Sequence, residues 1–107
     1  MPRRTIPEPH AAKVGERLRA LRLERGLSLG DVADAAKFSK GHLSSIEHGL
    51  AAITVPTIFR IAHALGLSPL YLLTFPEDDE WARAAELFRK MPAREVAKVR
   101  RELAKRR

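Results

Sequence analysis

SLGDVADAAKFSKGHLSSIEHG, residues 28–49, predicts two short helices joined by a tight turn. Ser28 is a good helix N-cap, and Asp31 three residues later completes a capping-box pattern. Ser39 is a second N-cap after the turn, and Gly49 ends the helix that Ser39 begins. The apolar positions that the two helices would turn inward are Val32, Ala33, Ala36, Leu43 and Ile46.

Three further helices are predicted around this pair. Apolar residues recur at helical spacing over residues 11–25. Thr54 caps a fourth helix, and Pro56 falls in its first turn, where a missing N–H does no harm. Ser68 caps a short fifth helix whose Leu70, Leu72 and Leu73 are expected to complete the core. Nothing alternates at period two, so residues 11–75 are predicted to form an all-α domain of five helices.

Both ends of the chain differ from this region. Residues 1–10 contain three prolines and no apolar periodicity, which indicates a mobile N-terminal arm. Beyond Pro76, residues 77–107 predict two amphipathic helices broken at Pro92, forming a C-terminal helical hairpin. The acidic residues 77–80 suit the positive end of the first helix dipole.

Composition narrows the class of protein. The net charge of +7 favours a polyanionic partner, because a cationic side chain that meets a phosphate releases a counterion. The absence of cysteine excludes disulfides, zinc-thiolate sites and thiol catalysis, and it suits a reducing compartment. No stretch approaches the roughly 18 apolar residues of a membrane span, so we expect a cytoplasmic protein without membrane contact.

No catalytic or metal-binding pattern stands out. The four histidines form no i, i+4 pair with a nearby acid. A glycine-rich phosphate loop, a nucleophile elbow and paired carboxylates are all missing from the sequence. We therefore expect no catalytic residue, no metal and no cofactor, and a binding protein rather than an enzyme.

Two helices and a tight turn form the arrangement that places a helix in the DNA major groove. Over residues 11–75 the sequence resembles, without gaps, the phage lambda/434 repressor-type (Cro/C1, XRE-like) helix-turn-helix family. The matching segments are LRALR (18–22), GLS (26–28), DVA (31–33), FS (38–39), LSSIEHG (43–49) and IAHALGL (61–67).

The resemblance implies a lambda-repressor-like DNA-binding domain and a transcriptional regulator that binds double-stranded DNA. The principal hypothesis is a homodimeric repressor that occludes a promoter at an inverted-repeat operator, with half-sites about 10–10.5 base pairs apart. One alternative is the antitoxin of a toxin–antitoxin pair, which would autoregulate through the same domain. Another is a basic helical module that binds nucleic acid or membranes without sequence preference.

The resemblance also implies which side chains read bases. The outward positions at the start and middle of the second motif helix are Lys40, Gly41, Ser44 and Ser45. A lysine at the first of these can donate to guanine O6 and N7. The alternative for Lys40 is a phosphate or solvent contact. Gly41 offers close approach or backbone donation without a side chain.

Phosphate contacts are implied for Ser39 and His42, and Ser39 is expected to cap the helix as well. The sequence departs from the family at Leu29, where a phosphate-binding glutamine is usual, and at the apolar residues 50–53. Compensating contacts are sought among Arg3, Arg4, Lys13, Arg17, Lys37 and the basic C-terminus.

A second implied pair is structural. Arg22 and Glu47 match positions that the family uses as an internal salt bridge between the first helix and the end of the third. Glu47 is therefore assigned to the scaffold and not to catalysis.

The predicted tail carries more apolar surface than two solvated helices leave bare. The residues expected to form its interface are Trp81, Phe88, Met91, Val96, Val99 and Leu103. The favoured hypothesis is dimerisation, and the layout weakly resembles the tail of Sin-type repressors. Packing against residues 11–75, or binding of a toxin or antirepressor, are the alternatives.

Overall fold

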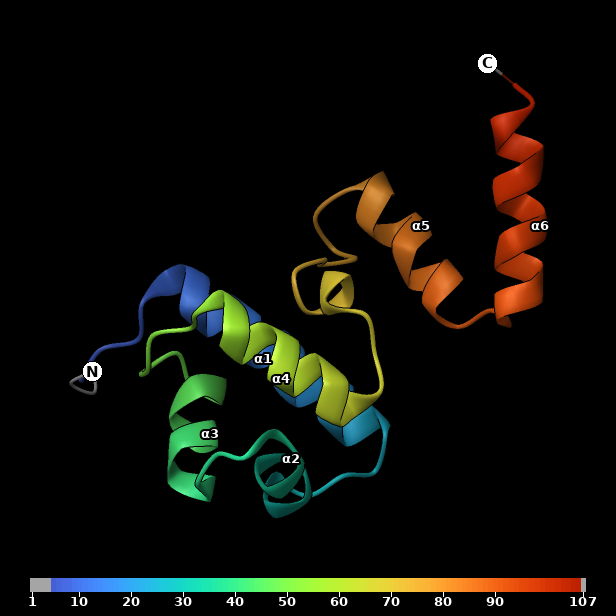
Figure 1. Ribbon diagram of the computed structural model, residues 1–107. Helices are drawn as coiled ribbons and strands as arrows, with labels where there is room; N and C mark the ends of the chain where they lie inside the picture. The colour runs from blue at the N-terminus through green and yellow to red at the C-terminus, as the bar shows by residue number, and fades with distance from the viewer. Residues whose placement is uncertain (1–4, 107) are drawn as a thin grey trace. The chain divides into compact units, whose positions relative to one another are not determined.

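The computed structural model describes residues 5–106, and every regular element in that range is helical (Figure 1). The predicted all-α class is therefore confirmed. The chain divides into two units between Leu73 and Thr74. The first unit contains α1 (Pro9–Glu24), α2 (Leu29–Ala36), α3 (Lys40–Glu47), α4 (Val55–Leu65) and the 3₁₀ turn η1 (Pro69–Leu72). The second contains α5 (Glu80–Arg89) and α6 (Ala93–Ala104).

Helix α1 begins earlier than the sequence pattern indicates. The Glu8 carboxylate accepts a hydrogen bond from the amide of Ala11 at 2.7 Å, and Pro9 occupies the first helical position. Backbone hydrogen bonding holds the pKa of Glu8 below its usual range. The predicted arm is therefore wrong for residues 9 and 10, which belong to α1. Arg3 and Arg4 lie outside the described residues.

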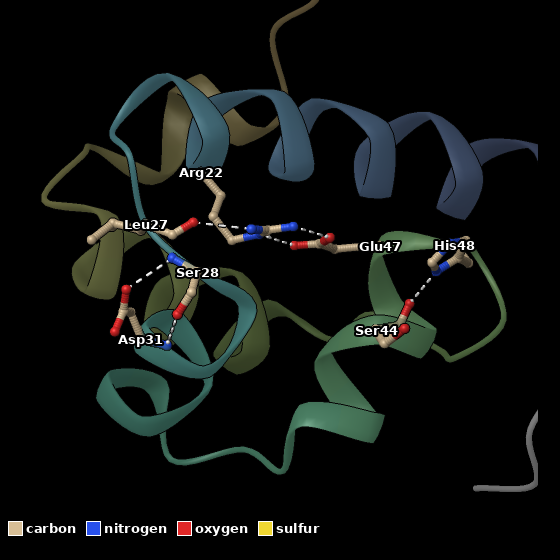
Figure 2. Close-up of polar contacts among 7 residues, drawn as sticks. All are labelled: Arg22, Leu27, Ser28, Asp31, Ser44, Glu47 and His48. Carbon is tan, nitrogen blue, oxygen red and sulfur yellow. Dashed lines mark hydrogen bonds and ion pairs between the residues drawn. The ribbon is translucent and has the colours of Figure 1, made fainter.

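Side-chain caps begin both helices of the central pair. The Ser28 hydroxyl accepts from the amide of Asp31 at 3.0 Å, and the Asp31 carboxylate accepts from the amide of Ser28 at 2.8 Å (Figure 2). The hydrogen bond from the Ser28 backbone lowers the pKa of Asp31. The Ser39 hydroxyl accepts from the amide of His42 at 3.1 Å. Both predicted caps are confirmed.

The core forms where α1 packs against α3, α2 packs against α3 and α4, and η1 covers α4 and α1. Each fully buried aliphatic side chain contributes about 1.5–3 kcal/mol through the hydrophobic effect. The core residues are Leu18, Leu21, Val32, Ala33, Ala36, Leu43, Ile46, Ile61, Ala62, Leu65 and Leu72.

The predicted fifth helix is only a 3₁₀ turn. Ser68 accepts from the amide of Leu70 at 3.3 Å, and Leu72 is fully buried. Leu70 and Leu73 are more than half exposed, at 55% and 51%, so their predicted place in the core is wrong. Residues three apart in a 3₁₀ turn eclipse one another, which puts Leu70 and Leu73 on the same outward side.

The second unit contains the two predicted tail helices. The Asp79 carboxylate accepts from the amide of Ala82 at 2.8 Å to begin α5, and Pro92 precedes α6. Trp81 is 87% exposed and Leu103 is 55% exposed. The other four residues predicted to form an interface are partly buried: Phe88, Met91, Val96 and Val99.

Candidate nucleic-acid interface

Helix α3 presents its N-terminal half to solvent. Lys40 and Gly41 are exposed, and Ser44 is partly exposed one turn further along. Ser45 is only 6% exposed, so the outward position predicted for this residue is wrong. Its side chain is enclosed by the domain, although the helical pattern alone gave no sign of that. The exposed set consists of one long cationic side chain and two small residues.

The Lys40 side chain lies across the first turn of α2. A Cβ atom placed on Gly30 would stand 2.8 Å from Cε of Lys40 and 3.6 Å from its Nζ. The missing side chain of Gly30 therefore leaves the path that Lys40 occupies. Sequence reasoning did not find Gly30, since a glycine inside a short helix carries no signal of its long-range neighbours.

The predicted phosphate-binding residues fall into two groups. Ser39, His42 and Lys37 are exposed and lie in the turn or in the first turn of α3, next to Lys40. Lys37 ends α2 in the left-handed conformation, with φ of 62°. This backbone region is unfavourable for a residue other than glycine.

Arg17 lies elsewhere in the domain. Its Nε donates to the carbonyl of Tyr71 in η1 at 2.9 Å. Gly15 faces α3, and two helical residues are separated by about 200° around the axis, so Arg17 points away from α3. The structure does not bring Arg17 together with Lys37, Ser39 and His42.

The predicted ion pair between Arg22 and Glu47 is present and joins α1 to the end of α3 (Figure 2). Nε of Arg22 donates to Oε2 of Glu47 at 2.7 Å, and Nη2 donates to Oε1 at 3.0 Å. The side chains are 9% and 2% exposed. Nη1 also donates to the Leu27 carbonyl at 3.0 Å. Hydrogen bonding to Glu47 raises the pKa of Arg22.

Helices α1 and α3 approach closely beside this pair. A Cβ atom on Gly15 would stand 2.4 Å from the carbonyl oxygen of Ile46 and 2.5 Å from that of Glu47. Only a glycine allows this separation of the two backbones. The buried end of α3 is thus fixed by backbone contact and by an ion pair, which leaves the opposite end free to meet a partner.

Other kinds of site find little support in residues 5–106. That range contains no group of three or more His, Asp or Glu side chains that could hold a metal ion. No helix within it is long and apolar enough to cross a bilayer. One imidazole nitrogen of His48 lies 2.7 Å from the carbonyl of Ser44, which is a local contact within α3 and its cap (Figure 2).

The model of the HTH_3 helix-turn-helix family matches residues 18–72, the segment that contains α2, the turn and α3. The chain belongs to this family. The resemblance stated from the sequence is confirmed, and so is the predicted function at the level that the family shares, which is DNA-binding transcriptional regulation. The match ends at Leu72, so it does not extend to α5 and α6.

Individual relatives agree with this HTH_3 assignment. The HTH-type transcriptional regulator y4dJ of Sinorhizobium fredii is 41% identical over 66 residues, which are 62% of this chain and 84% of y4dJ. The transcriptional regulator ClgR of Mycobacterium tuberculosis is 36% identical over 80 residues, 75% of this chain and 70% of ClgR. The restriction-modification controller protein C.AhdI of Aeromonas hydrophila is similar in structure, with a TM-score of 0.59, 29% identity and coverage of 61% of this chain and 98% of C.AhdI.

Proposed function

We propose that the protein is a sequence-specific repressor that binds an inverted-repeat operator as a homodimer and reads each half-site with α3. The observation that carries this proposal is the exposed N-terminal half of α3, where Lys40, Gly41 and Ser44 stand free while the other end is locked to α1. Two copies of α3 would enter successive major grooves about 10–10.5 base pairs apart. Repression would follow from occlusion of a promoter in the cytoplasm, without a cofactor or catalysis.

Phosphate contacts are proposed for Ser39, His42 and Lys37, which surround Lys40 on the exposed surface. Such contacts fix the register of a protein on DNA but carry no sequence information. The net charge of +7 supports them, and binding should weaken steeply as salt rises. Arg17 is not part of this group, because its side chain is bonded to η1.

Selection of bound sequences from a random DNA pool tests the proposal directly. We expect enrichment of one sequence arranged as an inverted repeat. Binding that shows no preference between the recovered and scrambled duplexes would instead support the basic module without sequence specificity. Enrichment of a single unrepeated site would argue against the dimer.

Lys40→Ala should lower affinity for the selected operator and relax the preference at one base pair of each half-site. Loss of a good side-chain contact to a base typically changes discrimination by about 1–3 kcal/mol. The measurement is titration of operators mutated one base pair at a time. An equal loss on specific and nonspecific DNA would assign Lys40 to a phosphate.

Gly30→Ala provides a matched second variant for the Lys40 prediction. The new Cβ would displace only the flexible end of Lys40, so the fold should keep its stability while the preference at the same base pair changes. In the Lys40→Ala background the Gly30 substitution should have no further effect on this preference.

Dimerisation is assigned to the tail on the basis of its exposed apolar side chains. Trp81, Leu87 and Leu103 are each more than half exposed, and α6 buries no residue. Acidic residues 77–80 precede α5, whereas α6 and the residues after it are mostly basic. Two copies could therefore pair apolar stripes and opposite charges together.

A chain ending at Pro76 should remain folded, be largely monomeric and bind the full operator by about two to four orders of magnitude more weakly. Linking two half-site contacts makes the second one intramolecular, and the truncated chain loses this advantage. C.AhdI, 98% of which is covered by the match, shows that a domain of this size forms a complete chain. Light scattering and operator titration on both lengths measure the effect.

Trp81→Ala combined with Phe88→Ala should reproduce the truncation without shortening the chain. If the full-length protein is monomeric at concentrations of tens of micromolar, or if the shortened chain still dimerises, the tail does not hold the dimer. A distinct protein partner such as a toxin or antirepressor would then be the better assignment for α5 and α6.

A further inference from the structure

Arg60 on α4 contacts three consecutive residues of the turn between α2 and α3. Its Nε donates to the carbonyl of Ala36 at 2.9 Å, and its Nη2 donates to the carbonyl of Lys37 at 2.7 Å. Its guanidinium carbon lies 4.1 Å from the centre of the Phe38 ring. One side chain from a different helix therefore holds the backbone and the aromatic ring of the turn together.

The turn needs such a restraint. The last carbonyls of α2 have no partners within the helix, and a cation at a helix C-terminus is favourable because of the helix dipole. Lys37 also sits in the left-handed region, which a residue with a side chain adopts only when neighbouring contacts hold it there. Arg60 satisfies two carbonyls on either side of this strained peptide.

The contact continues into α3. The Phe38 ring packs against the imidazole of His42, with centroids 5.1 Å apart and planes inclined by 58°. His42 lies in the first turn of α3, beside Lys40. Arg60, Phe38 and His42 thus form a stack that runs from α4 to the exposed end of α3.

We propose that Arg60 is a positioning residue that fixes the direction in which α3 leaves the turn, and that it thereby sets affinity for DNA. The proposal rests on the function proposed above for the exposed end of α3. Arg22 and Gly15 fix the other end of the same helix, so Arg60 supplies the second of two attachment points.

The geometry requires an arginine. A planar guanidinium donates two parallel hydrogen bonds and presents its face to an aromatic ring at the same time. A lysine ammonium is a point charge that could approach one carbonyl but could not also stack in this way. Arg60→Lys should therefore keep the charge and lose the function.

The test compares Arg60→Lys, Arg60→Ala and the charge-matched control Arg19→Ala, since Arg19 is exposed on α1 away from the turn. All are measured as full-length chains well below their thermal midpoints, on the operator recovered by selection. Both Arg60 variants should bind it about tenfold or more weakly, within the range typical of coupling between sites. Arg19→Ala should bind like the parent protein.

Salt dependence and amide hydrogen exchange separate positioning from other roles. The slope of log affinity against log salt should stay unchanged in Arg60→Lys and Arg60→Ala, because no phosphate contact is lost. Amide exchange at residues 37–42 of the free protein should become faster. Phe38→Leu should have a similar effect, and combining it with Arg60→Ala should add little.

Three results would overturn the inference. A salt slope reduced by about 1 would make Arg60 a phosphate ligand. Parental affinity in Arg60→Ala, with the parent still selecting its operator, would refute positioning while leaving the proposed function intact. Failure of the parent to select any sequence would refute both. If Arg60→Ala does not fold, Arg60→Lys and Phe38→Leu provide the same comparison.

Discussion

Glu47→Ala is expected to destabilise the domain by about 3–5 kcal/mol, the usual cost of leaving one member of a buried ion pair without its partner. The Arg22 guanidinium would remain 9% exposed, with only the Leu27 carbonyl to accept its protons. Arg22→Ala should have a similar effect, since it leaves the Glu47 carboxylate buried alone. Urea unfolding of both variants measures the loss.

A surface ion pair provides the matched control for this prediction. Arg83 pairs with Glu80 on α5, where the side chains are 49% and 86% exposed. Exposed pairs are worth about 0–1 kcal/mol, so Arg83→Ala should barely move the unfolding midpoint. If Glu47→Ala and Arg22→Ala are as stable as the control, the buried pair does not hold α1 against α3.

Gly15→Ala is the second substitution with a large expected effect. The added Cβ would meet the carbonyl oxygens of Ile46 and Glu47 at 2.4 and 2.5 Å, and backbone atoms in a helix cannot move aside as a side chain can. Overpacking of this kind costs about 1–3 kcal/mol or more. The shift of α3 should also weaken binding to the operator. Thermal unfolding and operator titration of the same preparation test both effects.

Gly41→Ala separates this steric effect from helix propensity. Alanine is favoured over glycine inside a helix by about 1 kcal/mol. A Cβ on Gly41 meets no atom within 4 Å, so this variant should be as stable as the parent or slightly more stable. Stabilisation of the same size by Gly15→Ala would show that the two helices are not in contact at this point.

Local signals explain which features could be predicted from the sequence. Ser28, Asp31 and Ser39 act through hydrogen bonds to residues three positions away, so their spacing alone reveals the caps. The inward residues of α2 and α3 follow from helical periodicity. The pair between Arg22 and Glu47 required the family resemblance, because 25 residues separate the two side chains in the sequence.

Contacts between distant segments could not be predicted. Gly15 and Gly30 matter because of what lies opposite the missing Cβ, and Arg60 acts on carbonyls 24 and 23 residues away. Ser45 was predicted to face outward because periodicity describes one helix and not the chain that covers it. The start of α1 at Pro9 was missed, since a glutamate is a less usual cap than Ser28 or Ser39.

The small size of the exposed surface on α3 limits how much sequence information one half-site can hold. Lys40 is the only long side chain there, and Gly41 and Ser44 reach little beyond the backbone. A single recognition surface of this kind would tolerate many sites in a genome. The proposed dimer would gain its selectivity by demanding two such matches at one fixed spacing. Discrimination among genes would then depend on the rigidity of the assembly more than on the vocabulary of the helix.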